Sequence, residues 1–64
     1  MNFKELEKII KADGWTLKEV DGSHYHYKHP SKKGKVTIPN HGSRDLNIKT
    51  IRSVLRQAGM GRWK

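Results

Sequence analysis

Histidine and lysine alternate with tyrosine along one short stretch of this chain. His24, His26 and Lys28 occupy every second position, with Tyr25 and Tyr27 between them. Because successive side chains of a β-strand point to opposite faces, a strand here would place both imidazoles and the ammonium group on one face. An imidazole with the ordinary pKa of about 6.5 accepts or donates protons near neutral pH. The spacing therefore indicates a candidate site for acid–base chemistry.

The net charge indicates which substrate such a site would meet. The 64 residues include fourteen Lys and Arg but only six Asp and Glu, a formal charge of +8, and this balance favours a polyanion as partner. RNA is a polyanion that carries its own nucleophile. If His24 takes the proton of a ribose 2′-hydroxyl, that oxygen can attack the adjacent phosphorus, while Lys or Arg side chains offset charge on the phosphoryl oxygens. This route needs no metal and no other cofactor.

Other interpretations of these residues remain open at this point. His24 could be an ordinary exposed strand histidine, because local spacing alone does not identify a catalyst. The positive charge could serve only to bind an acidic protein partner. Zinc is suggested by the four histidines, but a strand scatters the first three over both faces, so we expect no metal site. These histidines are His24, His26, His29 and His41.

The absence of certain residues and segments excludes several classes of protein. The chain contains no cysteine, which excludes disulfides, thiolate metal ligands and a cysteine nucleophile. No secretory signal is visible, and no apolar run approaches the length of a membrane span. We therefore expect a cytoplasmic protein with no membrane association and no small-molecule cofactor.

Two predicted helices flank the histidine stretch. The first is predicted over residues 2–12, where apolar residues recur at three- and four-residue spacing and Asn2 with Glu5 forms a capping box. Gly14 is placed to end it. The second is predicted over residues 47–58 and is ended by Gly59. Its apolar stripe comprises Ile48, Ile51, Val54, Leu55 and Ala58.

Three strands are predicted between the helices, over residues 15–20, 23–28 and 35–39. Asp21-Gly22 is a strong signal for a two-residue hairpin turn between the first two strands. Val36 lies on the apolar face of the third strand, which must be buried, and we expect Tyr27 to lie on the same buried face. His24 should therefore lie on the opposite, open face. The order predicts an α+β fold, a three-stranded antiparallel sheet with two helices packed on one face. We expect a single domain over residues 1–60 and a short C-terminal tail over residues 61–64.

Basic residues of the second helix form a further candidate surface. Lys49, Arg52 and Arg56 follow at i, i+3 and i+7, so they lie on one side of the helix. With no acidic residue between them, this stripe could track phosphates or be a merely solvated face. A second basic cluster, at positions 32, 33 and 35, allows the same two interpretations.

Several short motifs, taken in order, resemble the HicA toxin family along nearly the whole chain. Gly22-Ser23-His24 resembles the family's glycine-serine-histidine signature. Glu19 departs from the pattern, because relatives often carry arginine there. The flanking segments that also resemble the family are Gly14-Trp15, Tyr27, His29-Pro30, Pro39, His41, Asp45-Leu46, Thr50-Ile51-Arg52 and Leu55-Arg56-Gln57-Ala58-Gly59-Met60.

The resemblance implies a double-stranded-RNA-binding-domain-like fold, α-β-β-β-α, and the activity of an mRNA interferase. It implies that His24 is catalytic, that mRNA is cleaved independently of the ribosome, and that a HicB-type antitoxin neutralises the toxin. Our leading hypothesis is a metal-independent endoribonuclease in which Gly22 and Ser23 position His24. The alternative is a non-catalytic RNA-binding module, because this fold also binds RNA by shape. In the leading hypothesis the phosphates are held by Lys28, Lys49, Arg52 and Arg56.

Overall fold

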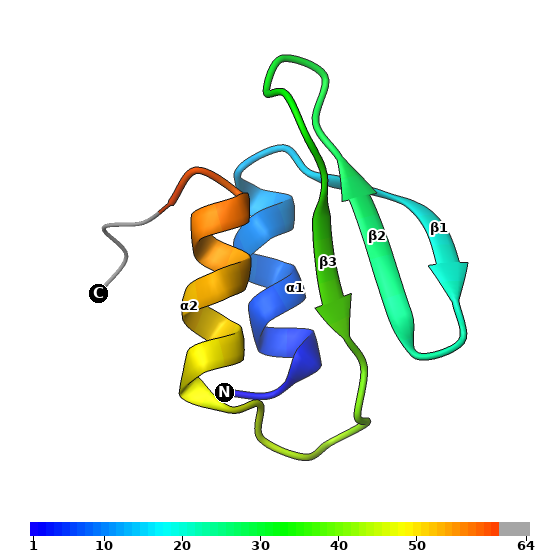
Figure 1. The fold of residues 1–64 in the computed structure, drawn as a ribbon, viewed down its shortest axis with the longest axis vertical. Helices are drawn as coiled ribbons and strands as arrows, with labels where there is room; N and C mark the ends of the chain where they lie inside the picture. Colours follow the sequence, from blue (N-terminus) through cyan, green and yellow to red (C-terminus); the bar gives the residue numbers. More distant parts are fainter. Residues whose placement is uncertain (61–64) are drawn as a thin grey trace.

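The computed structural model describes residues 1–60 and contains five elements in the predicted order (Figure 1). They are α1 (Phe3–Ala12), β1 (Thr16–Asp21), β2 (His24–Lys28), β3 (Val36–Pro39) and α2 (Ile48–Gln57). The α+β fold and the open three-stranded antiparallel sheet are therefore confirmed. Neither helix is long and apolar enough to cross a membrane, among the residues described. The predicted tail, residues 61–64, lies outside them.

Helix α1 begins and ends where its local motifs predict. The Asn2 side chain accepts a hydrogen bond from the backbone N–H of Glu5, and the Glu5 side chain accepts one from the backbone N–H of Asn2, which completes the capping box. At the other end, the N–H of Trp15 donates to the carbonyl of Ile10 at 3.2 Å, and Gly14 has a φ of +107°. This Schellman ending turns the chain back so that Trp15 packs in the core.

Strand β2 is the middle strand of the sheet, between β1 and β3. Both pairings are antiparallel, and Tyr27 lies opposite Leu17 of β1 and Val36 of β3. The helices lie together beside β3, and β1 lies farthest from them (Figure 1). Every residue of β1 is therefore exposed. The outer edge of β3 is partly covered, because the Gln57 side chain of α2 accepts a hydrogen bond from the N–H of Thr37 at 3.0 Å.

The hydrophobic core lies between the helices and one face of the sheet. Tyr27 is fully buried there, and its hydroxyl donates to Oε2 of Glu7 on α1 at 2.5 Å. Burial and the neighbouring carboxylate raise the pKa of Tyr27 well above its usual value, so the phenol stays protonated. The prediction that Tyr27 and Val36 lie on the covered face is confirmed, and the opposite face of the sheet is open. The other core side chains are Phe3, Leu6, Ile10, Trp15, Val36, Ile38, Leu46, Ile51, Val54, Leu55 and Ala58.

One residue of the predicted apolar stripe is not in the core. Ile48 is 58% exposed, so its assignment to the stripe was wrong. It is the first residue of α2, and the adjoining end of the core is filled by Leu46 instead, which is 8% exposed. The backbone N–H of Leu46 donates to the carbonyl of Met1 at 2.7 Å, which holds this segment against the N-terminus. The remaining stripe residues are buried as predicted: Ile51, Val54, Leu55 and Ala58.

The loop between β2 and β3 is anchored to the ends of both helices. Nε2 of His29 lies 2.7 Å from the carbonyl oxygen of Asp13, and the His29 ring packs edge to face on Trp15. Lys32 donates to the Asp13 carboxylate at 2.5 Å and to the carbonyl of Ala58 at 3.0 Å. The hydrogen bond from Lys32 holds the pKa of Asp13 below its usual range. His29 and Lys32 therefore have structural contacts.

Candidate active site

The turn between β1 and β2 fixes the backbone that carries His24. Its central residues are Gly22 and Ser23, because Asp21 pairs with His24 across the turn. The predicted centre, Asp21-Gly22, was one residue too early. Gly22 has a φ of +61°, whereas no other residue type in the described chain has a positive φ, and glycine at the first central position is typical of a type II′ turn. The N–H of Asn40 donates to the carbonyl of Ser23 at 2.7 Å and ties the turn to the end of β3.

His24 is the first residue of β2, and its side chain is exposed. In the sheet register it lies between Asp21 of β1 and Pro39 of β3. Because side chains alternate, it projects from the face opposite buried Tyr27, as predicted. Within residues 1–60, the histidine ring nitrogens that form hydrogen bonds belong to His26 and His29, not to His24. This imidazole is therefore accessible to a substrate while its backbone is held in the sheet.

His26 is the second imidazole of the open face and is half-buried. Its Nδ1 lies 2.9 Å from Oγ1 of Thr37, its register partner on β3. This bond orients the ring and leaves Nε2 as the nitrogen that can meet a ligand. His24 and His26 are two residues apart along β2, or about 7 Å. The open face therefore carries two imidazoles at a spacing that can flank one phosphate group.

A groove of about 500 Å³ lies on this face and is lined by His26, three lysines, two carboxylates and Tyr27. Lys28 comes from β2, Lys18 from β1, and Lys35 immediately precedes β3; we call them the groove lysines. The sequence predicted Lys28 on this face but not Lys18, and it grouped Lys35 with its neighbours in the loop. A β-bulge at Lys18 explains the difference, because an extra residue in a strand changes the face to which side chains point. No local sequence signal marks this bulge.

The basic stripe of α2 lies away from His24. Lys49, Arg52 and Arg56 are all exposed, on a helix that packs against the covered face and the outer edge of β3. The structure therefore separates this stripe from the open face. Of the predicted site residues, Gly22, Ser23 and His24 lie together at the turn, and Lys28 lies on the same face toward the other end of β2.

The remaining histidines do not join the open-face pair. His29 contacts the end of α1, and His41 is exposed in the loop that follows β3. Within the described part of the chain, no three histidine or carboxylate side chains are arranged to hold a metal ion. The chemistry that this face offers is proton transfer by imidazole next to a cationic groove.

Comparison with known proteins identifies the family of this chain. No curated protein matches it. The family model described as the HicA toxin of bacterial toxin-antitoxin systems matches residues 3–60. The matched range includes both helices, the whole sheet and the turn that carries His24. The chain therefore belongs to the HicA family of toxins from bacterial toxin–antitoxin systems.

Proposed function

We propose that this HicA toxin is a metal-independent endoribonuclease that cleaves mRNA in the bacterial cytoplasm, with His24 as a catalytic residue. The observation that carries the proposal is the exposed imidazole of His24, held at the end of a strand on an open, lysine-bearing face. Membership of a toxin family supports a damaging activity that a partner must restrain. RNA supplies its own nucleophile, the ribose 2′-hydroxyl, so the protein needs to provide only the acid–base groups.

Two proton transfers are required for the cleavage step. One base accepts the 2′-hydroxyl proton as the 2′-oxygen bonds to the adjacent phosphorus. The bond from phosphorus to the 5′-oxygen of the next nucleotide breaks, and that oxygen takes a proton from an acid. The products are a 2′,3′-cyclic phosphate and a 5′-hydroxyl end. His24 and His26 supply the two groups, and each such transfer contributes about 10² to 10⁴ in rate.

The neighbouring residues position the catalyst and the substrate. Gly22 and Ser23 form the turn that sets the start of β2, and Lys28 binds a phosphate of the substrate from the same face. The stripe formed by Lys49, Arg52 and Arg56 lies on a separate surface, so in this proposal it contacts a more distant part of a long RNA. A HicB-type antitoxin would inhibit the toxin by lying across the open face, and a charge of +8 favours an acidic partner.

Cleavage of RNA in EDTA by purified wild type and by His24→Ala tests the proposal. We expect fragments from the wild type and a rate lower by about 10² to 10⁴ for the variant, with unchanged circular dichroism and RNA affinity. A matched oligonucleotide with 2′-deoxyribose at one position keeps its phosphate charge but lacks the nucleophile there, so that bond should stay intact. A mobility shift of intact RNA by the wild type would instead support the non-catalytic RNA-binding module.

A substrate with sulfur in place of the bridging 5′-oxygen separates the roles of the two histidines. A thiolate leaves without needing a proton, so a variant that lacks the general acid should regain its rate on this substrate. We expect recovery for His26→Ala and none for His24→Ala. The reverse pattern would exchange the two roles, and recovery of neither variant would remove proton donation by His26 from the mechanism.

A further inference from the structure

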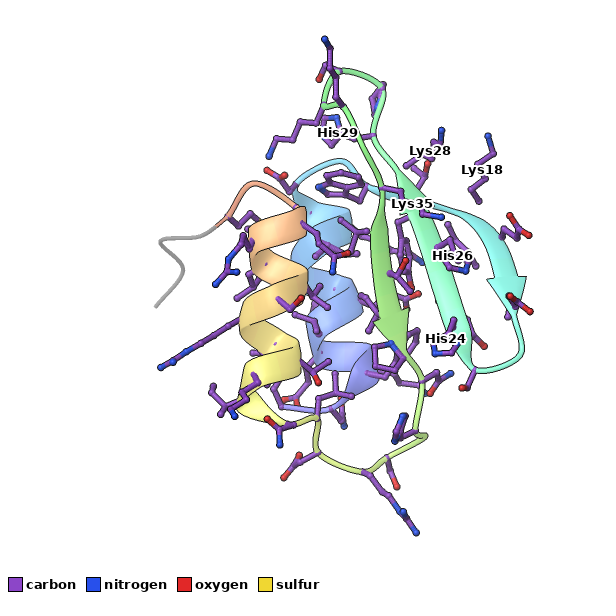
Figure 2. The ribbon with its side chains drawn as sticks, viewed as in Figure 1. Lys18, His24, His26, Lys28, His29 and Lys35 are labelled. Atoms are coloured by element: carbon purple, nitrogen blue, oxygen red, sulfur yellow. The ribbon has the colours of Figure 1, made fainter. Side chains whose placement is uncertain are left out.

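The groove lysines and His24 lie toward opposite ends of β2. Lys28 follows His24 by four positions along the strand, so their backbones lie about 13 Å apart at the rise of a β-strand. Figure 2 shows His24 toward the turn end of β2, Lys18, Lys28 and Lys35 at the other end, and His26 between them. Adjacent phosphates of one RNA strand lie closer together than this distance. An RNA strand that runs along β2 therefore places a phosphate other than the scissile one beside the lysines.

The groove lysines have no acidic partner within residues 1–60. The ion pairs present there are formed by the N-terminus, Lys11 and Lys32. Glu19 and Asp21 line the same groove but form no ion pair with its lysines. Lys32 differs from the groove lysines, because its ammonium group donates to Asp13 and to the carbonyl of Ala58 and so connects two helix ends. The three lysines outnumber the two carboxylates of the groove and form no ion pair with them, which favours the entry of an anion.

We propose that the groove lysines form a subsite for RNA that binds a phosphate other than the scissile one. This inference rests on the proposed ribonuclease function. Lysine recognises phosphate as a point charge and does not read base identity, so the subsite selects substrate length and not sequence. The RNA strand would run along β2, from His24 at the turn to the lysines at the opposite end.

Binding of uncleavable oligonucleotides tests the subsite without requiring catalysis. The probes are 2′-O-methyl RNAs of two and of eight nucleotides. Lys18→Ala/Lys35→Ala should bind the long probe roughly threefold to tenfold more weakly than wild type and the short probe equally well. For the long probe, the slope of log affinity against log salt should become shallower by about 0.7 for each phosphate that the variant no longer neutralises.

A matched variant separates the subsite from net charge. Lys4→Ala/Lys8→Ala removes the same charge from exposed positions of α1 and should weaken the long probe less than twofold. Equal losses in the two double variants would overturn the subsite, because net charge alone would then explain them. Equal affinity of the wild type for the two probes would overturn it as well.

Cleavage of DNA strands that contain a single ribonucleotide then locates the subsite, because only one bond can be cut. The effect of Lys18→Ala/Lys35→Ala on the rate should appear only when the strand extends beyond the two nucleotides that flank that bond. An equal effect on a dinucleotide would place the lysines at the scissile phosphate and refute the inference. If wild type cleaves none of these strands, the ribonuclease proposal fails while the binding results still stand.

Discussion

Replacing Gly14 with alanine should cost more stability than its backbone conformation alone explains. Gly14 has a φ of +107°, and a Cβ there would lie 2.7 Å from Nε2 of His29. The same nitrogen is hydrogen-bonded to the carbonyl of Asp13, so the ring cannot retreat without losing that bond. The strained φ costs about 1 to 3 kcal/mol, and breaking the hydrogen bond adds about 1 kcal/mol. The expected total of about 2 to 4 kcal/mol approaches the whole net stability of so small a domain.

Gly22→Ala is the matched control for this substitution. Gly22 also has a positive φ, +61°, but no atom lies within 4 Å of a Cβ built there. It should therefore show only the left-handed backbone cost of about 1 to 2 kcal/mol. Urea unfolding followed by circular dichroism, with trimethylamine N-oxide added to keep the variants folded, gives the free energy of unfolding of each. We expect Gly14→Ala to be the less stable of the two by at least about 1 kcal/mol.

A double-mutant cycle isolates the collision itself. In a His29→Ala background the obstructing ring is absent, so the cost of Gly14→Ala should fall toward that of Gly22→Ala. If Gly14→Ala costs the same with and without His29, the collision contributes nothing and the reasoning is refuted.

Three further predictions concern contacts in the core and at the helix ends. Tyr27→Phe removes the hydrogen bond to Glu7 and should lower the free energy of unfolding in urea by about 1 to 2 kcal/mol, whereas unchanged stability would contradict a net contribution from that bond. Because Lys32 lowers the pKa of Asp13, their pair should stabilise the fold above pH 3.8, the ordinary value for that carboxyl, and lose this effect as pH falls through the lower folded value. Melting temperatures between pH 2 and 5 should therefore depend less on pH in Asp13→Asn; an equal dependence would contradict this linkage. Ile48→Ala, at an exposed position, should change the free energy of unfolding in urea by less than about 0.5 kcal/mol. A destabilisation as large as that of a core truncation would show that the Ile48 side chain contributes to the core.

The order of elements could be predicted from the sequence because its signals are local. The capping box at Asn2 and the glycine at Gly14 act within a few residues of the helix ends that they set. The face of β2 that carries His24 could also be predicted, since alternation requires only that Tyr27 be covered. These inferences needed no knowledge of how distant segments pack.

The arrangement of the basic side chains could not be predicted in the same way. Lys18 enters the groove through a bulge in strand pairing, which depends on the register of β1 against β2. Lys32 looks like a surface cation in the sequence, yet it joins two helix ends that are far apart along the chain. The separation of Arg52 from His24 follows from the side of the sheet on which α2 packs. Each of these features is set by tertiary contacts.

The hydrogen bond between the Gln57 side chain and Thr37 covers part of one edge strand of the sheet, β3, whereas the other edge strand, β1, is exposed. A polypeptide that extended the sheet next to β3 would first have to displace Gln57, whereas β1 presents a border whose residues are all exposed. Growth of the sheet past β1 would widen the surface around His24 without obstructing it. Under the proposed ribonuclease function, an inhibitor that only added a strand next to β1 would leave RNA free to enter, so inhibition would require a partner that covers the open face.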